Sequence, residues 1–162
     1  MGQKALPMLV QGAIDYLETV VTSDMDVFEW GAGRSTQWFA DRVKSIVSIE
    51  HQEKWFKIVS IYLKDRSNVN FLMIEQESDR YINVISDYDD ESFDLLVIDG
   101  RRRVECISKA LCKLKRGGYL LFDDVQRGRY RLAWPMFRSW PDAHEFEFRG
   151  KHRKVTGIYR KP

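Results

Sequence analysis

Residues 27–36 constrain the fold of this chain more than any other stretch. They read VFEWGAGRST: an apolar run, an acid, two glycines one residue apart and two hydroxyl residues. The apolar run predicts a buried strand, and Ser35 can cap a helix that begins directly after the glycines. A Gly-x-Gly turn between strand and helix brings bare backbone N–H groups close to a ligand, with the positive end of the helix dipole behind them. The stretch therefore predicts a nucleotide-type binding turn.

Two acids narrow the class of ligand. A dinucleotide-binding turn carries a third glycine and faces a pyrophosphate, whereas this chain has Thr36 at that position and Glu29 just before the first glycine. A carboxylate repels a pyrophosphate but suits an ammonium group and a sulfonium centre. Glu50 ends the next apolar run, about twenty residues on, where an acid accepts hydrogen bonds from ribose hydroxyls. We therefore expect an adenosine-like ligand with a positively charged tail.

The pattern E-x-G-x-G-x-S-T, with an acid ending the second strand, resembles the cofactor site of class I S-adenosylmethionine-dependent methyltransferases. The resemblance implies S-adenosyl-L-methionine as the cofactor. It also places the adenine contacts in the loop 75–78. The sequence does not show which of these four residues make the contacts, and Glu77 and Ser78 are our candidates. The full set of cofactor residues expected on this basis is Glu29, Gly31, Ala32, Gly33, Ser35, Thr36, Glu50, His51, Glu77, Ser78 and Asp99.

Strand and helix patterns alternate along the chain. Strand-like runs are found at 25–29, 45–50, 69–74, 93–100 and 119–122, and a final hairpin at 144–149 and 155–159. Helical patterns are found at 7–21, 35–42, 104–114 and 130–140. Right-handed crossovers then give a doubly wound α/β fold, with a mostly parallel seven-stranded sheet, helices on both faces and an antiparallel C-terminal hairpin. The resemblance implies the strand order 3-2-1-4-5-7-6.

Length and charge limit the functional class. A chain of 162 residues predicts one domain, with a capping helix within 1–22, laid against the domain or over the cofactor, and a Rossmann-like core over 25–160. The net charge of +2 argues against a general affinity for polyanions. No apolar run reaches the ~20 residues of a membrane span, and the first residues lack the apolar core of a secretory signal. We expect a cytoplasmic protein without a membrane partner.

Acids also end the fourth and fifth predicted strands. Asp99 and the pair Asp123 and Asp124 follow neighbouring strands, so their oxygens could converge on Mg²⁺. This arrangement resembles metal-dependent O-methyltransferases of the catechol type, although the pair is Asp-Asp here where that type has an acid and an amide. The sequence leaves a second interpretation open, in which one of the pair caps the following turn and Asp99 orients the cofactor without metal.

Two arginine clusters frame the same sheet edge. Residues 101–103 follow Asp99, and Arg127, Arg129 and Arg131 follow the fifth strand. Charge runs are usually solvated, but these follow strand ends, so we expect Arg101 to face the pocket and either bind an anionic substrate or neutralise the acids. Asp99, as base or metal ligand, and Arg101 are therefore the candidate catalytic residues.

The acceptor is inferred by exclusion. The Asn/Asp-Pro-Pro-aromatic loop of amino-group methylases is missing after the fourth strand, and Cys106 and Cys112 lie in a helical pattern rather than in a nucleophile loop. The sequence therefore predicts O-methylation of a small-molecule acceptor, anionic or sugar-like. Two alternatives stay open: an RNA-binding, RNA-modifying or regulatory module that keeps this fold, and an NAD-dependent reductase. A homo-oligomer in which a partner subunit supplies part of the pocket is also compatible with so short a chain.

Overall fold

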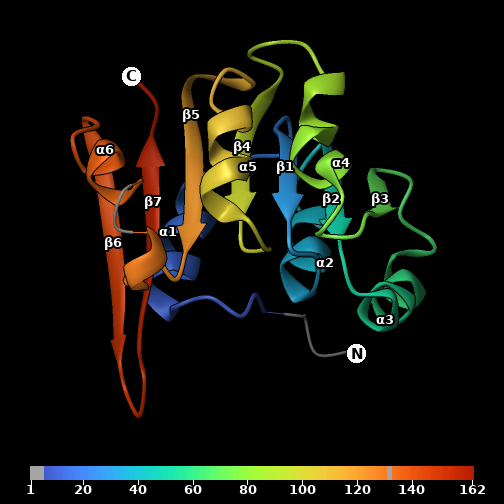
Figure 1. The fold of residues 1–162 in the computed structure, drawn as a ribbon, viewed down its shortest axis with the longest axis horizontal. Coiled ribbons are helices and arrows are strands. Elements are labelled where there is room, and N and C mark those ends of the chain that lie inside the picture. The colour runs from blue at the N-terminus through green and yellow to red at the C-terminus, as the bar shows by residue number, and fades with distance from the viewer. Residues whose placement is uncertain (1–5, 131–132) are drawn as a thin grey trace.

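One seven-stranded sheet organises the computed structural model, which describes residues 6–130 and 133–162 and omits the side chain of Trp134 (Figure 1). The strand order is β3-β2-β1-β4-β5-β7-β6, and β7 is antiparallel to both of its neighbours, whereas the other pairings are parallel. The predicted fold class and strand order are therefore confirmed.

The strands are β1 Asp26–Trp30, β2 Ser45–Glu50, β3 Val69–Met73, β4 Phe93–Ile98, β5 Leu114–Asp123, β6 Asp142–Arg149 and β7 Arg153–Arg160. The helices are α1 Gln11–Val20, α2 Arg34–Ala40, α3 Glu53–Leu63, α4 Asp79–Asn83, α5 Arg103–Ala110 and α6 Trp134–Arg138, with 3-10 turns η1 Val84–Asp87 and η2 Gly128–Tyr130.

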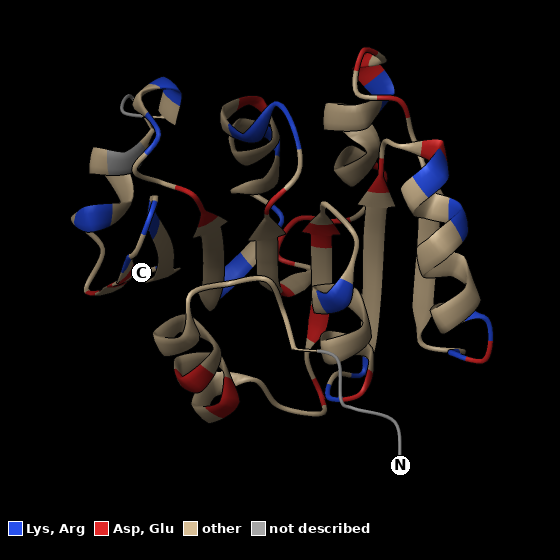
Figure 2. Ribbon diagram, turned by 90° about the horizontal axis from the view of Figure 1, so that it is seen from below, with Lys and Arg blue, Asp and Glu red and all other residues tan. Residues whose placement is uncertain are grey.

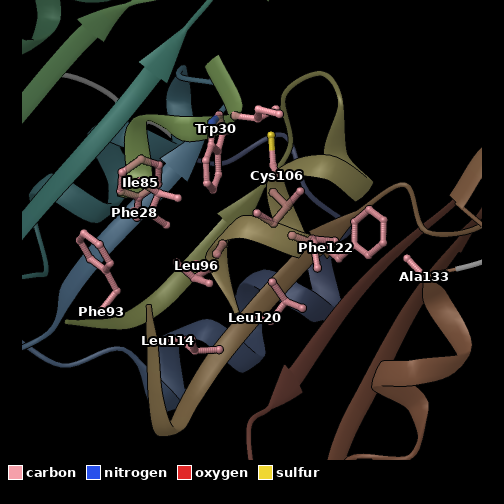
Figure 3. Packing of buried hydrophobic residues seen from close by; sticks show 14 of the residues in the cluster. Phe28, Trp30, Ile85, Phe93, Leu96, Cys106, Leu114, Leu120, Phe122 and Ala133 are labelled. Atoms are coloured by element: carbon pink, nitrogen blue, oxygen red, sulfur yellow. The ribbon is translucent and has the colours of Figure 1, made fainter. Parts of the chain in front are cut away.

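Both faces of the central strands are buried, which explains why these strands read as continuous apolar runs. Successive side chains of a strand point to opposite faces, so Phe28 packs with α4 and α5 on one side while Val27 packs with α1 and α2 on the other. Figure 3 shows the first of these cores, in which Phe28, Trp30 and Phe122 lie beside Cys106 of α5. The two cores fix the strand ends, and with them the loops that form the site.

The structure corrects the end of one predicted helix. We expected the helix at 104–114 to run into residues 115–118 as a basic, glycine-terminated last turn, but α5 ends at Ala110 and those residues belong to β5. Leu114 is buried and pairs with Phe93, and the register then shifts before Leu95 pairs with Tyr119. Gly117 has φ +74, so the glycines serve an irregularity in the strand rather than the end of a helix.

The first and last helices also differ from the prediction. Helix α1 begins at Gln11 and packs against β6 and β7, so the segment before it, rather than the helix, approaches the sheet edge where β1 and β2 end. Of the helix expected over 130–140, the described residues show the end of η2 at Tyr130 and helix α6, and Arg131 lies outside the described residues. None of the helices in the described residues is long and apolar enough to cross a membrane.

Candidate active site

A cavity of about 260 Å³ opens where β1, β2 and β4 end at one edge of the sheet. Figure 2 shows acidic residues at the ends of several strands and basic residues in the loops that follow them. The turn after β1 contributes Gly31, Ala32, Gly33 and Ser35 to the cavity wall. Four of the residues predicted to bind the cofactor are thus brought together by this turn.

Gly31 holds the turn after β1 tightly against the turn after β4. Its φ is +100, and a Cβ at this position would lie 2.7 Å from both the carbonyl carbon of Asp99 and the backbone nitrogen of Gly100. A hydrogen bond from Asp99 N to Trp30 O at 2.9 Å fixes the same approach, and Gly31 N donates to Ile49 O of β2 at 2.9 Å. A side chain at position 31 would separate the two turns.

Glu29 lies beneath the turn and not in the cavity wall. It is fully buried, and its carboxylate accepts hydrogen bonds from Ser35 Oγ at 2.5 Å, Thr36 Oγ1 at 2.5 Å and Ser48 Oγ at 2.6 Å. Burial raises the pKa of Glu29, while the three hydroxyl donors oppose that shift. We expected Glu29 to face a cofactor ammonium group, and this geometry corrects that expectation: the carboxylate supports the turn from below.

Thr36 belongs to the same buried network. Its hydroxyl accepts a hydrogen bond from Gly33 N at 2.9 Å, so the turn's backbone is tied through Thr36 to Glu29. Thr36 is buried and does not line the cavity. Its predicted contact with the cofactor therefore becomes an indirect one, through the position of Gly33.

Glu50 and His51 line the opposite side of the cavity, as the sequence predicts. Glu50 Oε1 accepts hydrogen bonds from the backbone nitrogens of His51 at 2.8 Å and Gln52 at 2.7 Å, and lies 3.0 Å from His51 Nδ1. The other oxygen, Oε2, has no hydrogen-bond donor within 6–130 or 133–162. One carboxylate oxygen is thus fixed by the backbone while the other is free to accept a hydrogen bond from a ligand.

Two parts of the wall have no signal in the predicted motifs. Trp55 at the start of α3 donates its indole N–H to Ala32 O at 2.9 Å and lies next to Gly33. Met8 and Leu9 reach the cavity from the segment before α1. These contacts depend on tertiary structure, so spacing along the sequence could not reveal them.

Asp99 completes the cavity from the end of β4. Its side chain is 28% exposed, and its Oδ1 accepts a hydrogen bond from Arg103 at 2.9 Å. Burial, followed by the charge of Asp123, raises the pKa of Asp99 to about 8, while Arg103 and Lys154 oppose the shift. A carboxylate with a raised pKa at the cavity wall can take up a proton near neutral pH.

The predicted metal site is not formed. Asp123 accepts a hydrogen bond from Thr156 Oγ1 at 2.6 Å and pairs with Lys154 at 3.0 Å, while Asp124 pairs with Arg127. Across the described residues, no cluster of three acids, histidines or cysteines could hold a metal ion. Each predicted ligand is already neutralised by a basic side chain, so the residues do not fit Mg²⁺ and the resemblance to the catechol type is not supported.

Arg101, Glu77 and Ser78 lie outside the cavity. The side chain of Arg101 is exposed, and with Glu77 it lines a separate open hollow of about 560 Å³. Ser78 Oγ caps α4 by accepting a hydrogen bond from Arg80 N at 3.2 Å. The structure therefore does not bring these three predicted site residues together with the others, because the loop after β3 turns away into α4.

Comparison with known families decides the class of protein. A family model described as a methyltransferase domain matches residues 28–125, which include the glycine turn, Glu50 and Asp99. The chain belongs to this methyltransferase domain family. A search of curated proteins with the same sequence finds no match.

Solved structures share the fold of this methyltransferase domain. An rRNA methylase from Streptococcus thermophilus is 16% identical, with a TM-score of 0.67 over 91% of this chain and 93% of that one. A Streptococcus mutans protein solved in complex with SAH is 14% identical, with a TM-score of 0.67 and 99% of both chains covered. Precorrin-6y C5,15-methyltransferase from Geobacter metallireducens is 14% identical, with a TM-score of 0.70 over 100% of this chain and 98% of that one. At these identities the similarity establishes the fold alone.

The cavity of the methyltransferase domain fits an adenosine-based cofactor. Glu50 Oε2 is an unused acceptor of the kind that binds ribose hydroxyls, and the backbone of residues 31–33 is open to a ligand on the other side. Trp55 offers an apolar surface between them.

Proposed function

We propose that this enzyme binds S-adenosyl-L-methionine in the cavity between β1, β2 and β4 and transfers its methyl group to an oxygen of a small acceptor. The observation that carries the proposal is Glu50, whose Oε1 is held by two backbone N–H groups while Oε2 has no donor among the described residues. This arrangement suits two adjacent ribose hydroxyls. The methionine end would then lie over the backbone of residues 31–33.

The cofactor supplies a methyl group activated by a sulfonium centre, so the protein's own contribution is alignment and proton transfer. The acceptor hydroxyl must lose a proton as its oxygen bonds to the methyl carbon, and Asp99 is the base that we assign to it. Its position at the cavity wall and its raised pKa support this role, because a base works best with a pKa near the working pH. Arg103 holds the carboxylate at 2.9 Å and keeps it oriented.

Calorimetric titration with S-adenosylmethionine, S-adenosylhomocysteine and NAD tests the cofactor assignment. We expect both sulfur compounds to bind and NAD not to bind, and Glu50→Gln to weaken binding about tenfold or more, because a hydrogen bond to a charged acceptor contributes ~1.5–3 kcal/mol. Glu53→Gln is the matched control, since Glu53 lies three residues away, is exposed and pairs with Lys57. NAD binding in place of the sulfur compounds would revive the reductase alternative and refute the proposal.

Gly33→Ala provides a second test that separates binding from folding. The φ of Gly33 is 172, which any residue adopts, and an added Cβ would meet only Trp55 Nε1 at 3.6 Å. The fold should therefore tolerate alanine. The methyl group would project into the cavity, so cofactor binding should weaken while the urea midpoint stays unchanged. Unchanged binding in this variant would place the cofactor elsewhere.

A further inference from the structure

Another hollow, distinct from the one that Glu77 lines, lies between the loop after β4 and the segment after β5. It measures about 290 Å³, and its wall includes Arg101, Arg102, Arg103, Arg129 and Tyr130. Arg103 connects the two sites, since it lines this hollow and donates a hydrogen bond at 2.9 Å to Oδ1 of Asp99, which lines the cavity. A molecule in the hollow would therefore be next to the proposed base.

Two of the four arginines have no acidic partner. Arg103 pairs with Asp99, and Arg102 Nε donates to Glu105 Oε1 at 3.0 Å. Arg101 and Arg129 are exposed and form no ion pair or side-chain hydrogen bond with any residue that the structure describes. Because the one acid in the wall, Glu105, is already paired, the hollow presents two uncompensated guanidinium groups.

Tyr130 supplies the apolar part of the hollow. Its ring is buried against Phe122, with ring centroids 5.3 Å apart, and the guanidinium carbons of Arg129 and Arg103 lie 5.1 and 5.5 Å from its centroid. Arg103 and Arg129 are thus arranged around a fixed aromatic ring. Such a site can hold an organic group against the ring and its anionic end against the arginines.

We propose that this hollow binds the acceptor and that Arg101 and Arg129 recognise a phosphate group on it. The inference rests on the proposed function, which it deepens by naming the substrate class: a small phosphomonoester that carries a hydroxyl group. A phosphate carries close to two negative charges at neutral pH and accepts bidentate hydrogen bonds from guanidinium groups, which matches two unpaired arginines. The hydroxyl to be methylated would extend past Arg103 toward Asp99.

A single phosphate fits the surroundings better than a nucleic-acid backbone. The neighbouring hollow on the other side of Arg101 is lined by Glu77 and Asp79, which would repel a second phosphate. Among the described residues, Arg102 and Arg127 are also basic and close to the site, and both are paired with acids. The net charge of +2 also gives the protein little overall attraction for a polyanion.

Titration of the full chain with phenyl phosphate, benzoate and inorganic phosphate at fixed ionic strength tests the subsite. We expect phenyl phosphate to bind more tightly than benzoate, and Arg101→Gln and Arg129→Gln each to weaken its binding about tenfold or more. Arg116→Gln is the matched control, because Arg116 is 86% exposed near the start of β5 and should leave binding unchanged. S-adenosylhomocysteine binding, measured in the same preparations, should be equal in all variants.

Several results would overturn the subsite. One is wild-type protein that binds phosphate no more strongly than it binds chloride. Another is an equal loss of phenyl phosphate binding in Arg116→Gln. A third is binding of a single-stranded RNA oligonucleotide whose salt dependence corresponds to more than about two phosphate contacts. The last result would favour the nucleic-acid alternative. If the wild type does not bind S-adenosylhomocysteine, but its binding of phenyl phosphate still depends on Arg101 and Arg129, the result counts against the proposed function and not against the subsite. The two failures are therefore distinguishable.

Discussion

Individual carboxylates with similar sequence signals have different environments in this structure. Glu29 and Glu50 both lie at the ends of apolar strands, yet Glu29 is enclosed by three hydroxyls and Glu50 faces the cavity. The sequence predicts both as acids at the ends of strands. Because the hydroxyl of Ser48 comes from the next strand, only the folded chain reveals that the Glu29 carboxylate already accepts hydrogen bonds from the protein. The glycines of the turn, by contrast, could be identified from sequence, because their backbone geometry is a local requirement.

Asp99 should link stability and activity to pH in opposite directions. Its pKa in the folded protein, about 8, lies above its ordinary value of 3.8. The stability that comes from its protonated form is therefore fully present below the ordinary pKa and is lost as the pH rises through about 8. The activity of Asp99 as a base requires the ionised form and should rise over the same range.

Urea unfolding at pH 5 and pH 9 measures this linkage. Between these values the free energy of unfolding of the wild type should fall relative to that of Asp99→Asn, by on the order of 1–3 kcal/mol. Asp89→Asn, at an exposed position, is the control and should follow the wild type. Parallel behaviour of the wild type and Asp99→Asn would show that Asp99 has an ordinary pKa.

Gly31→Ala should destabilise the fold by about 1–3 kcal/mol, because the residue combines a positive φ with a backbone contact at 2.7 Å. Gly128→Ala is the matched control, since no atom lies within 4 Å of the added Cβ. Denaturant midpoints of the two variants measure the difference. Equal midpoints would mean that the two turns can separate at little cost.

At the level of elements, the C-terminal hairpin fixes the segment that reaches the cavity. Thr156 on β7 donates to Asp123 Oδ1 at 2.6 Å and accepts from Val10 N at 3.5 Å, and Lys154 donates to Met8 O at 2.5 Å. Segment 6–10 is thus held by residues that lie 146 positions further along the chain. The alternation of apolar and polar residues predicts the hairpin, but it does not predict the contact between the hairpin and segment 6–10.

Thr156→Val should loosen segment 6–10 and lower the free energy of unfolding by about 1–3 kcal/mol, because Asp123 would lose a buried hydrogen-bond donor. Hydrogen exchange at Leu9 and Val10 should accelerate more than exchange in β1. Thr19→Val serves as control, since the Thr19 hydroxyl is exposed and bonds only within α1, to Tyr16 O. Exchange that is unchanged at Val10 would show that the hairpin does not hold this segment.

At the level of the whole molecule, the sequence predicts the sheet well and the metal site poorly. The doubly wound sheet follows from strand and helix patterns that alternate along the whole chain, and its strand order follows from the family resemblance. The predicted metal site fails because its acids meet basic partners from distant elements: Lys154 on β7 pairs with Asp123, and Arg127 pairs with Asp124. Which side chains neutralise one another depends on how the elements pack, and spacing alone does not record it.

The most direct test is a crystal structure of the chain in complex with S-adenosylhomocysteine. The account predicts the ligand in the cavity between β1, β2 and β4, with its ribose hydroxyls within hydrogen-bonding distance of Glu50 Oε2 and its amino-acid end over the backbone of residues 31–33. A ligand bound at another site, or a ribose with no contact to Glu50, would contradict it.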